Sequence, residues 1–166
     1  MDPTALVKHA EDDHNIWLWP LMYEPTENPE IIDAFFNEIG VERDKLIIAD
    51  SADKYTGENK GTVEMVKSLK SKPWNIKKVT KNKGIIFWIN SMKKKKIHIV
   101  KNHLYPKIKK EQEMYRMREI NGISINQPID GWDHFWAASR YAHMEFNSGG
   151  LTRQETSDDV MSQLGL

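Results

Sequence analysis

The residues with the clearest capacity for chemistry are Asp50 and the side chains of a helical segment far downstream. Asp50 follows the apolar run 46–49, and a carboxylate at the end of a buried strand is a typical oxygen ligand for a divalent cation. The later segment spaces His134, Ala137 and Tyr141 so that they share one face of a helix. We therefore predict that this strand end and this helix face lie together over a sheet and form a metal site.

Each of these positions also has a purely structural interpretation. Asp50 could be a turn acid, and His134 could be a buried histidine rather than one that orients a water or moves a proton. Ala137 carries no ligating atom, although a carboxylate at that position would help to complete such a site. Asp133, directly before the helix, is expected to be its N-cap.

Strands alternate with helices after an opening hairpin, which predicts an α/β fold with a mixed sheet flanked by helices. The predicted strands are 5–10, 16–19, 46–49, 76–79 and 97–100, and the predicted helices are 29–39, 62–70, 85–92, 109–118 and 133–146. The run 46–49 is continuously apolar, as in a strand buried on both faces of a sheet. Pro20 indicates an edge or a bulge, and Asn121-Gly122 indicates a hairpin turn.

The net charge of zero conceals three blocks of different charge. Residues 1–64 hold 15 acids and 5 bases, residues 65–110 hold 15 lysines and no acid, and residues 111–166 hold 9 acids and 4 bases. A lysine block without acidic neighbours favours binding to a phosphate backbone, although it could also be a solvated face. The candidate DNA-contacting residues are Lys81, Lys83, Lys93, Lys94, Lys95 and Lys96. Glu111 and Glu113, which follow the block, are expected to be surface acids paired with basic neighbours, with catalysis as the alternative role.

Composition excludes several classes of protein. The chain has no cysteine, so it has neither a disulfide framework nor a thiolate zinc site. No apolar run approaches the roughly 20 residues of a membrane-spanning helix, and no signal peptide is visible. We expect a soluble intracellular protein without a membrane partner, with one domain over 1–148 and a mobile tail over 149–166 that is rich in Gly, Ser and Asp.

The order and spacing of these motifs resemble the nuclease domain of tailed-phage terminase large subunits. The motifs are LIIADSA at 46–52, Glu111 four residues before Tyr115, Pro128, and DHFWAASRYA at 133–142. The resemblance runs from Asp2 to about Phe146. It implies an RNase H-like fold, a mixed sheet flanked by helices, and metal-dependent endonucleolytic cleavage of double-stranded DNA during genome packaging.

The resemblance assigns roles to individual positions. In the family, the aspartate after the isoleucine-rich strand is a metal ligand, and here it is Asp50. The family's last helix reads Asn-His-x-x-Asp-Ala-x-Arg-Tyr, so Asp133 replaces the asparagine, His134 matches, and Ala137 stands where a metal-binding aspartate is expected. Asp2, in the opening Asp-Pro-Thr-Ala, matches an accessory carboxylate near the metals.

The family's first strand, which carries the first catalytic aspartate, would lie before Met1. The resemblance therefore implies that the first strand is truncated and that this chain is catalytically inactive, because two magnesium or manganese ions about 3.5–4 Å apart need several carboxylates. A missing interior strand would leave 46–49 unpaired on one side. We expect a rearranged N-terminus, a swapped neighbour or a second copy of the chain to fill that gap.

The family also implies partners and a location: double-stranded DNA, an ATPase half, a small terminase subunit, a portal, and the cytoplasm of the bacterial host. Two alternatives stay open on the sequence. The chain could be a non-catalytic DNA-binding or assembly remnant that uses the lysine block. It could also be another RNase H-like nucleotidyl transferase, such as a transposase or resolvase.

Overall fold

The computed structural model of the chain describes residues 3–26, 28–50, 65–129 and 131–148. In chain order the elements are β1 (Thr4–Glu11), β2 (Asn15–Glu24), α1 (Pro29–Glu38), β3 (Ile47–Ala49), α2 (Met65–Lys70), β4 (Ile76–Lys78), α3 (Ile85–Lys93), β5 (Lys96–Ile99), α4 (Tyr105–Met114), β6 (Met117–Ile120), β7 (Ile123–Pro128) and α5 (His134–Asn147). Asp2, the start of the predicted helix 62–70 and the predicted tail 149–166 lie outside the described residues. Among the described residues, no helix is both long and apolar enough to cross a membrane.

The first sheet has the order β1-β2-β5 and is mixed, because β1 and β2 are antiparallel and β2 and β5 are parallel. Alternation along β2 buries one set of its residues: Ile16, Leu18, Pro20 and Met22. The register between β1 and β2 shifts between Leu6 and Val7, and Val7 is the partner of Pro20. The predicted bulge at Pro20 is thus confirmed, whereas the edge interpretation is wrong because β2 is the middle strand.

The second sheet consists of β3 and β4, which pair in parallel with Ile47 opposite Ile76. The apolar run 46–49 does form a strand, as predicted, but Ile47–Ala49 are only half-buried. The expectation that this strand is buried on both faces of one large sheet is therefore wrong. Its apolar residues instead pack against two separate clusters, one with α1 and α2 and one with α5.

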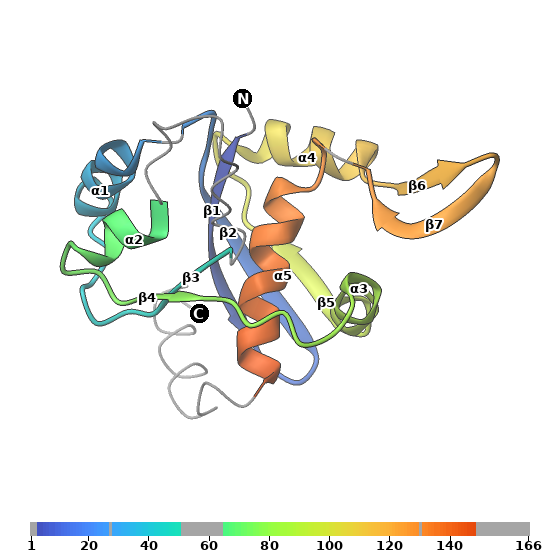
Figure 1. Ribbon diagram of the computed structural model, residues 1–166, viewed down its shortest axis with the longest axis horizontal. Coiled ribbons are helices and arrows are strands. Elements are labelled where there is room, and N and C mark those ends of the chain that lie inside the picture. The colour runs from blue at the N-terminus through green and yellow to red at the C-terminus, as the bar shows by residue number, and fades with distance from the viewer. Residues whose placement is uncertain (1–2, 27, 51–64, 130, 149–166) are drawn as a thin grey trace.

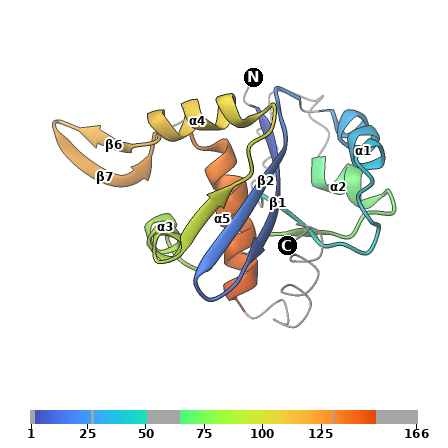
Figure 2. The same cartoon turned by 180° about the vertical axis from the view of Figure 1, so that it is seen from behind.

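Helix α5 joins the two sheets. It lies diagonally across one face of the β1-β2-β5 sheet and also contacts β3 (Figure 1), and the view from behind shows the strands in front of it (Figure 2). Phe135 of α5 packs with Ile16 and Leu18 of the first sheet, and Met144 packs with Val79 and Trp88 near the second. Burial of these apolar side chains fixes α5 over both sheets.

In the part of the chain that the structure describes, each sheet has an unpaired edge beneath α5. Among the described residues, β1 is hydrogen-bonded only to β2, and β3 only to β4. The expectation that 46–49 presents one unpaired side is confirmed for this part of the chain. Because an open edge is a template for another strand, the segment that fills this gap stays a prediction.

The region after β5 differs from its predicted structure. The helix predicted at 109–118 is α4, which begins at Tyr105, with Pro106 in its first turn, and ends at Met114. Residues after it form the β6–β7 hairpin, which protrudes from the body (Figure 1). Asn121 and Gly122 both have positive φ, 52° and 75°, as the predicted tight turn requires.

Candidate functional site

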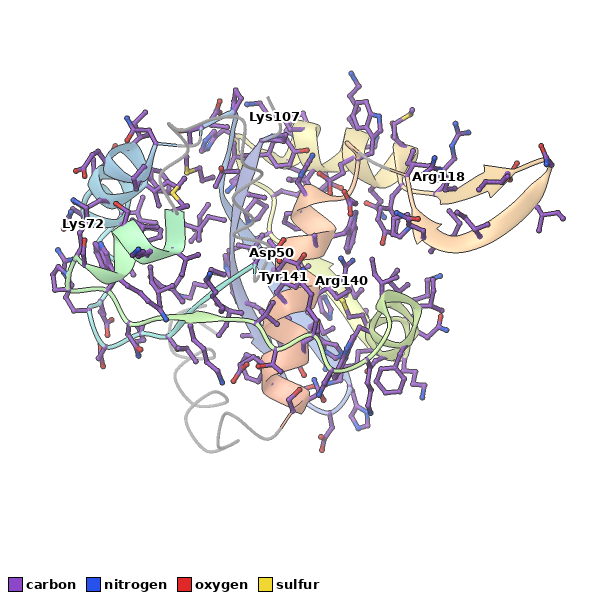
Figure 3. All side chains as sticks on the ribbon, in the orientation of Figure 1. Asp50, Lys72, Lys107, Arg118, Arg140 and Tyr141 are labelled. Atoms are coloured by element: carbon purple, nitrogen blue, oxygen red, sulfur yellow. The ribbon has the colours of Figure 1, made fainter. Side chains whose placement is uncertain are left out.

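Asp50 and α5 meet as the sequence predicts. The Tyr141 hydroxyl donates a hydrogen bond to Oδ2 of Asp50 at 3.1 Å, and the Lys81 ammonium lies 2.6 Å from Oδ1. Asp50 follows β3, Lys81 follows β4, and Tyr141 lies in α5. Figure 3 shows Asp50, Tyr141 and Arg140 close together at the middle of α5. Packing of α5 over β3 therefore creates this contact.

The contact with Asp50 changes the pKa of both Lys81 and Tyr141. Burial would lower the pKa of Lys81, but the hydrogen bond to Asp50 and the attraction of nearby negative charge outweigh burial, so the pKa is raised. Burial and the charge of Asp50 raise the pKa of the Tyr141 hydroxyl. At neutral pH Lys81 is therefore a cation that balances Asp50, and Tyr141 is a neutral donor.

A pair of divalent ions does not fit the described residues around Asp50. Two-metal hydrolysis needs several carboxylates. Within the described part of the chain, the group of ligating side chains that could hold an ion does not include Asp50. The Lys81 ammonium already lies against one oxygen of Asp50. Asp2, the predicted second ligand, lies outside the described residues, so its role stays a prediction.

His134 and Ala137 are both in α5, as predicted, and their catalytic roles stay predictions. The His134 ring packs edge-on to Tyr23, with 6.5 Å between ring centroids, and its Nε2 is buried without a hydrogen-bond partner among the described residues. Ala137 is half-buried and lies one helical turn before Tyr141, the residue that contacts Asp50. A carboxylate side chain at position 137 would thus be attached to α5 one turn before Tyr141, the residue that contacts Asp50.

The N-terminus of α5 is held by a residue of another helix. Glu111 of α4 is fully buried, and its Oε1 accepts the backbone N–H groups of Phe135 at 2.9 Å and Trp136 at 3.2 Å. Its Oε2 accepts the Tyr23 hydroxyl at 2.6 Å. Asp133 is at the N-cap position, as predicted, but its side chain makes no capping hydrogen bond. The predicted surface role of Glu111 is therefore wrong, because Glu111 does the capping.

Burial dominates the electrostatics of this cap. It raises the pKa of Glu111, although the Tyr23 hydroxyl and the α5 amides favour the charged carboxylate. Burial and the Glu111 charge also raise the pKa of Tyr23. The signal in the sequence is the spacing of Leu104, Ile108 and Glu111, which places the glutamate on the apolar face of a helix. Glu113 is exposed and pairs with Lys109 at 3.7 Å, as predicted.

A second polar cluster, not predicted from the sequence, joins the β1–β2 hairpin to the C-terminal half of α5. Oε2 of Glu11 lies 2.9 Å from Nε2 of His9 and 2.7 Å from Nδ1 of His143. Its Oε1 accepts hydrogen bonds from Lys95 at 2.9 Å and Asn147 at 2.7 Å. The side chains of His9, Glu11 and His143 are only 3%, 4% and 0% exposed. All four donors therefore converge on one buried carboxylate.

The charges of this cluster are balanced within it. Burial lowers the pKa of His9. Burial alone would raise the pKa of Glu11, but the hydrogen bonds from His143 and His9 hold it well below its usual range. Two imidazole nitrogens and a carboxylate oxygen within 4.8 Å of one another are also a candidate set of metal ligands. Because Lys95 already neutralises Glu11, we assign the cluster a structural role.

The lysine-rich segment does have acidic partners in three dimensions. Lysines of this segment that form ion pairs with acids include Lys72, Lys77, Lys81, Lys95, Lys107 and, within α4, Lys109. The interpretation of the whole block as unpaired positive charge is therefore wrong. Of the candidate DNA-contacting residues, Lys81 pairs with Asp50 and Lys95 with Glu11, whereas Lys83, Lys93, Lys94 and Lys96 are exposed. Contact with DNA stays a prediction for all six.

Comparison with known proteins gives one informative likeness. No protein-family model and no curated protein matches the chain. Among solved structures, the chain is similar to the nuclease domain of the large terminase, g2p, of bacteriophage SPP1, whose crystal structure contains bound manganese. The TM-score is 0.65 at 22% sequence identity, and the match covers 85% of this chain and 77% of that one.

This likeness establishes the fold. The chain has the RNase H-like α/β fold of a terminase nuclease domain, as its sequence motifs predict.

Proposed function

We propose that this chain is a nuclease-type domain of a phage DNA-packaging terminase, acting on double-stranded DNA, and that it does not cleave DNA as it stands. The observation that carries the proposal is the contact of the strand-end Asp50 with Tyr141 of α5, within a fold shared with a terminase nuclease domain. The manganese bound to the SPP1 domain supports a divalent-metal reaction for the parent activity. Ala137 in α5 supports its loss here, because alanine offers no ligand.

The residues around Asp50 suit binding better than hydrolysis. Paired metal ions in nucleases activate a water and stabilise the leaving oxygen. Here Asp50 is bound to Lys81 and Tyr141, so its carboxylate is oriented but neutralised. The nearby cations can instead contact phosphates of the DNA backbone. A non-catalytic DNA-binding or assembly remnant is the second candidate, favoured by the exposed lysines Lys93, Lys94 and Lys96.

The proposal extends to partners and location. An ATPase half, a small terminase subunit and a portal would be the protein partners, within the cytoplasm of a bacterial host. Among the described residues, one edge of β1 and one edge of β3 have no strand partner, which supports a further strand between the sheets, supplied by another segment or by a second copy of the chain.

The proposal is tested by restoring a carboxylate at position 137. We expect Ala137→Asp to bind Mn²⁺ at least about tenfold more tightly than the parent, which corresponds to about 1.4 kcal/mol, because a second carboxylate can share an ion with Asp50. Isothermal titration with MnCl₂ measures the affinity. Addition of Asp50→Asn to Ala137→Asp should abolish the gain. Plasmid nicking in manganese then shows whether the two carboxylates are enough for cleavage.

Ala138→Asp is the matched control, since it adds the same charge on the next residue, which is turned about 100° around the helix. Circular dichroism confirms that each variant is folded. Equal Mn²⁺ affinity for the parent, Ala137→Asp and Ala138→Asp would refute a metal site at this position and leave the DNA-binding remnant as the better candidate.

A further inference from the structure

A small cationic pocket lies beside Asp50. Its lining includes Lys81, Lys83, Trp88, Arg140 and Tyr141, and its volume is about 120 Å³. Lys81 and Tyr141 are also the residues that contact Asp50. The pocket is therefore next to the strand end and has room for several water molecules or a small anion.

Arg140 is the most informative residue of the lining. It is only 5% exposed, and a guanidinium offers hydrogen-bond donors but no acceptor. Its neighbours include the Tyr141 ring, 5.6 Å from the guanidinium carbon, and the Tyr115 hydroxyl. No carboxylate of the described residues lies within ion-pair distance of it. Because a buried charge without a counterion is costly, an anion that is not among the described residues is needed to complete this site.

The other lining groups also donate rather than accept. The Lys83 ammonium lies 4.0 Å from the centroid of the Phe87 ring and 5.8 Å from that of Trp88. The indole N–H of Trp88 is buried and has no acceptor among the described residues. Asp50 balances Lys81, but neither Arg140 nor Lys83 forms an ion pair with a described residue. The pocket thus has an excess of positive charge and of hydrogen-bond donors.

We propose that this pocket binds a phosphate group of the nucleic-acid backbone and holds it next to Asp50 through Arg140 and Lys83. Guanidinium groups donate paired hydrogen bonds to phosphate oxygens, and the lysine adds charge. Nucleic acid as the source of the phosphate rests on the proposed function. A phosphate held here fixes the position of the DNA strand relative to Asp50 without reading its sequence.

The test measures binding of a fluorescent 20-base-pair duplex by anisotropy, in 50 to 200 mM salt, for the parent, Lys83→Met, Arg140→Met and Lys70→Met. Lys70 is the control, because it is an exposed lysine of α2 outside the pocket. We expect Lys83→Met and Arg140→Met each to weaken binding about three- to tenfold at low salt. Each should also reduce the slope of log K against log salt by about one. Lys70→Met should stay within about twofold of the parent.

A second arm separates free phosphate from DNA. Inorganic phosphate should raise the melting temperature of the parent and of Lys70→Met, but not that of Lys83→Met. If all four proteins bound the duplex equally well, the pocket would not be a phosphate site, and the proposed function would be unaffected. Failure of the parent to bind the duplex would contradict the proposed function. If inorganic phosphate still stabilised the parent in that case, the pocket would bind phosphate, but nucleic acid would be ruled out as its source. Lys83 is exposed, so Lys83→Met keeps the test decisive even if Arg140→Met does not fold.

Discussion

Replacement of Glu11 by glutamine is expected to destabilise the chain by about 3–5 kcal/mol, the range found when one partner of a buried ion pair is removed. Glutamine keeps the volume but removes the charge that accepts hydrogen bonds from His9, His143, Lys95 and Asn147. The Lys95 ammonium, whose side chain is 14% exposed, then loses its carboxylate. Total stabilities of domains are only about 5–15 kcal/mol. Urea unfolding and thermal melting measure the loss.

The control for this variant is Glu24→Gln. Glu24 is on the same hairpin, but its side chain is 54% exposed and pairs with Lys107 at 2.9 Å. Exposed ion pairs contribute about 0–1 kcal/mol, so Glu24→Gln should unfold close to the parent. A Glu11→Gln variant that is as stable as Glu24→Gln would show that the cluster does not hold the hairpin to α5.

Replacement of Glu111 by alanine is expected to cost about 3 kcal/mol or more. Loss of a helix cap costs about 0.5–2 kcal/mol, and the two amides at the start of α5 lose their acceptor. The Tyr23 hydroxyl also loses its partner, and an unsatisfied buried group costs about 1–3 kcal/mol. Chemical denaturation measures the free energy, and the melting temperature should fall by several degrees.

Two further variants test whether loss of the cap causes the lower stability of Glu111→Ala. Glu111→Gln keeps one acceptor oxygen and should restore part of the lost stability. Glu113→Ala changes an exposed residue of the same helix, paired with Lys109, and should cost no more than about 0.5 kcal/mol. Equal effects of Glu111→Ala and Glu113→Ala would contradict the capping role of Glu111.

Local patterns predicted the elements well where packing agrees with them. The Asn28 side chain accepts the Glu30 N–H at 2.9 Å, so α1 begins where the sequence indicates. The segment after α4 was predicted incorrectly because Met117–Ile120 pairs with Ile123–Pro128 around the tight turn. Formation of that hairpin overrides the helical tendency of its first strand.

The sequence predicted the contact between Asp50 and α5, but it did not predict the ion pairs and hydrogen bonds around that contact. A strand-end acid and a helix with His134, Ala137 and Tyr141 on one face were enough to predict that Asp50 and α5 meet, and Tyr141 makes the contact. The pairing of Lys81 with Asp50, and of His143 with Glu11, depends on how the sheets pack against α5. Charge blocks along a sequence do not show which lysines meet an acid from a distant segment. For the same reason, the buried role of Glu111 was missed.

The most direct test of a DNA-binding, nuclease-type surface at Asp50 and α5 is an NMR titration of the unmodified, ¹⁵N-labelled chain with a short DNA duplex at 50 mM salt. We expect the amide signals of residues 81–84 and 137–141 to shift in a salt-dependent manner, while those of α1 and of Lys70 stay in place. No shift at low salt, or shifts confined to α1 and α2, would contradict a DNA site at this position.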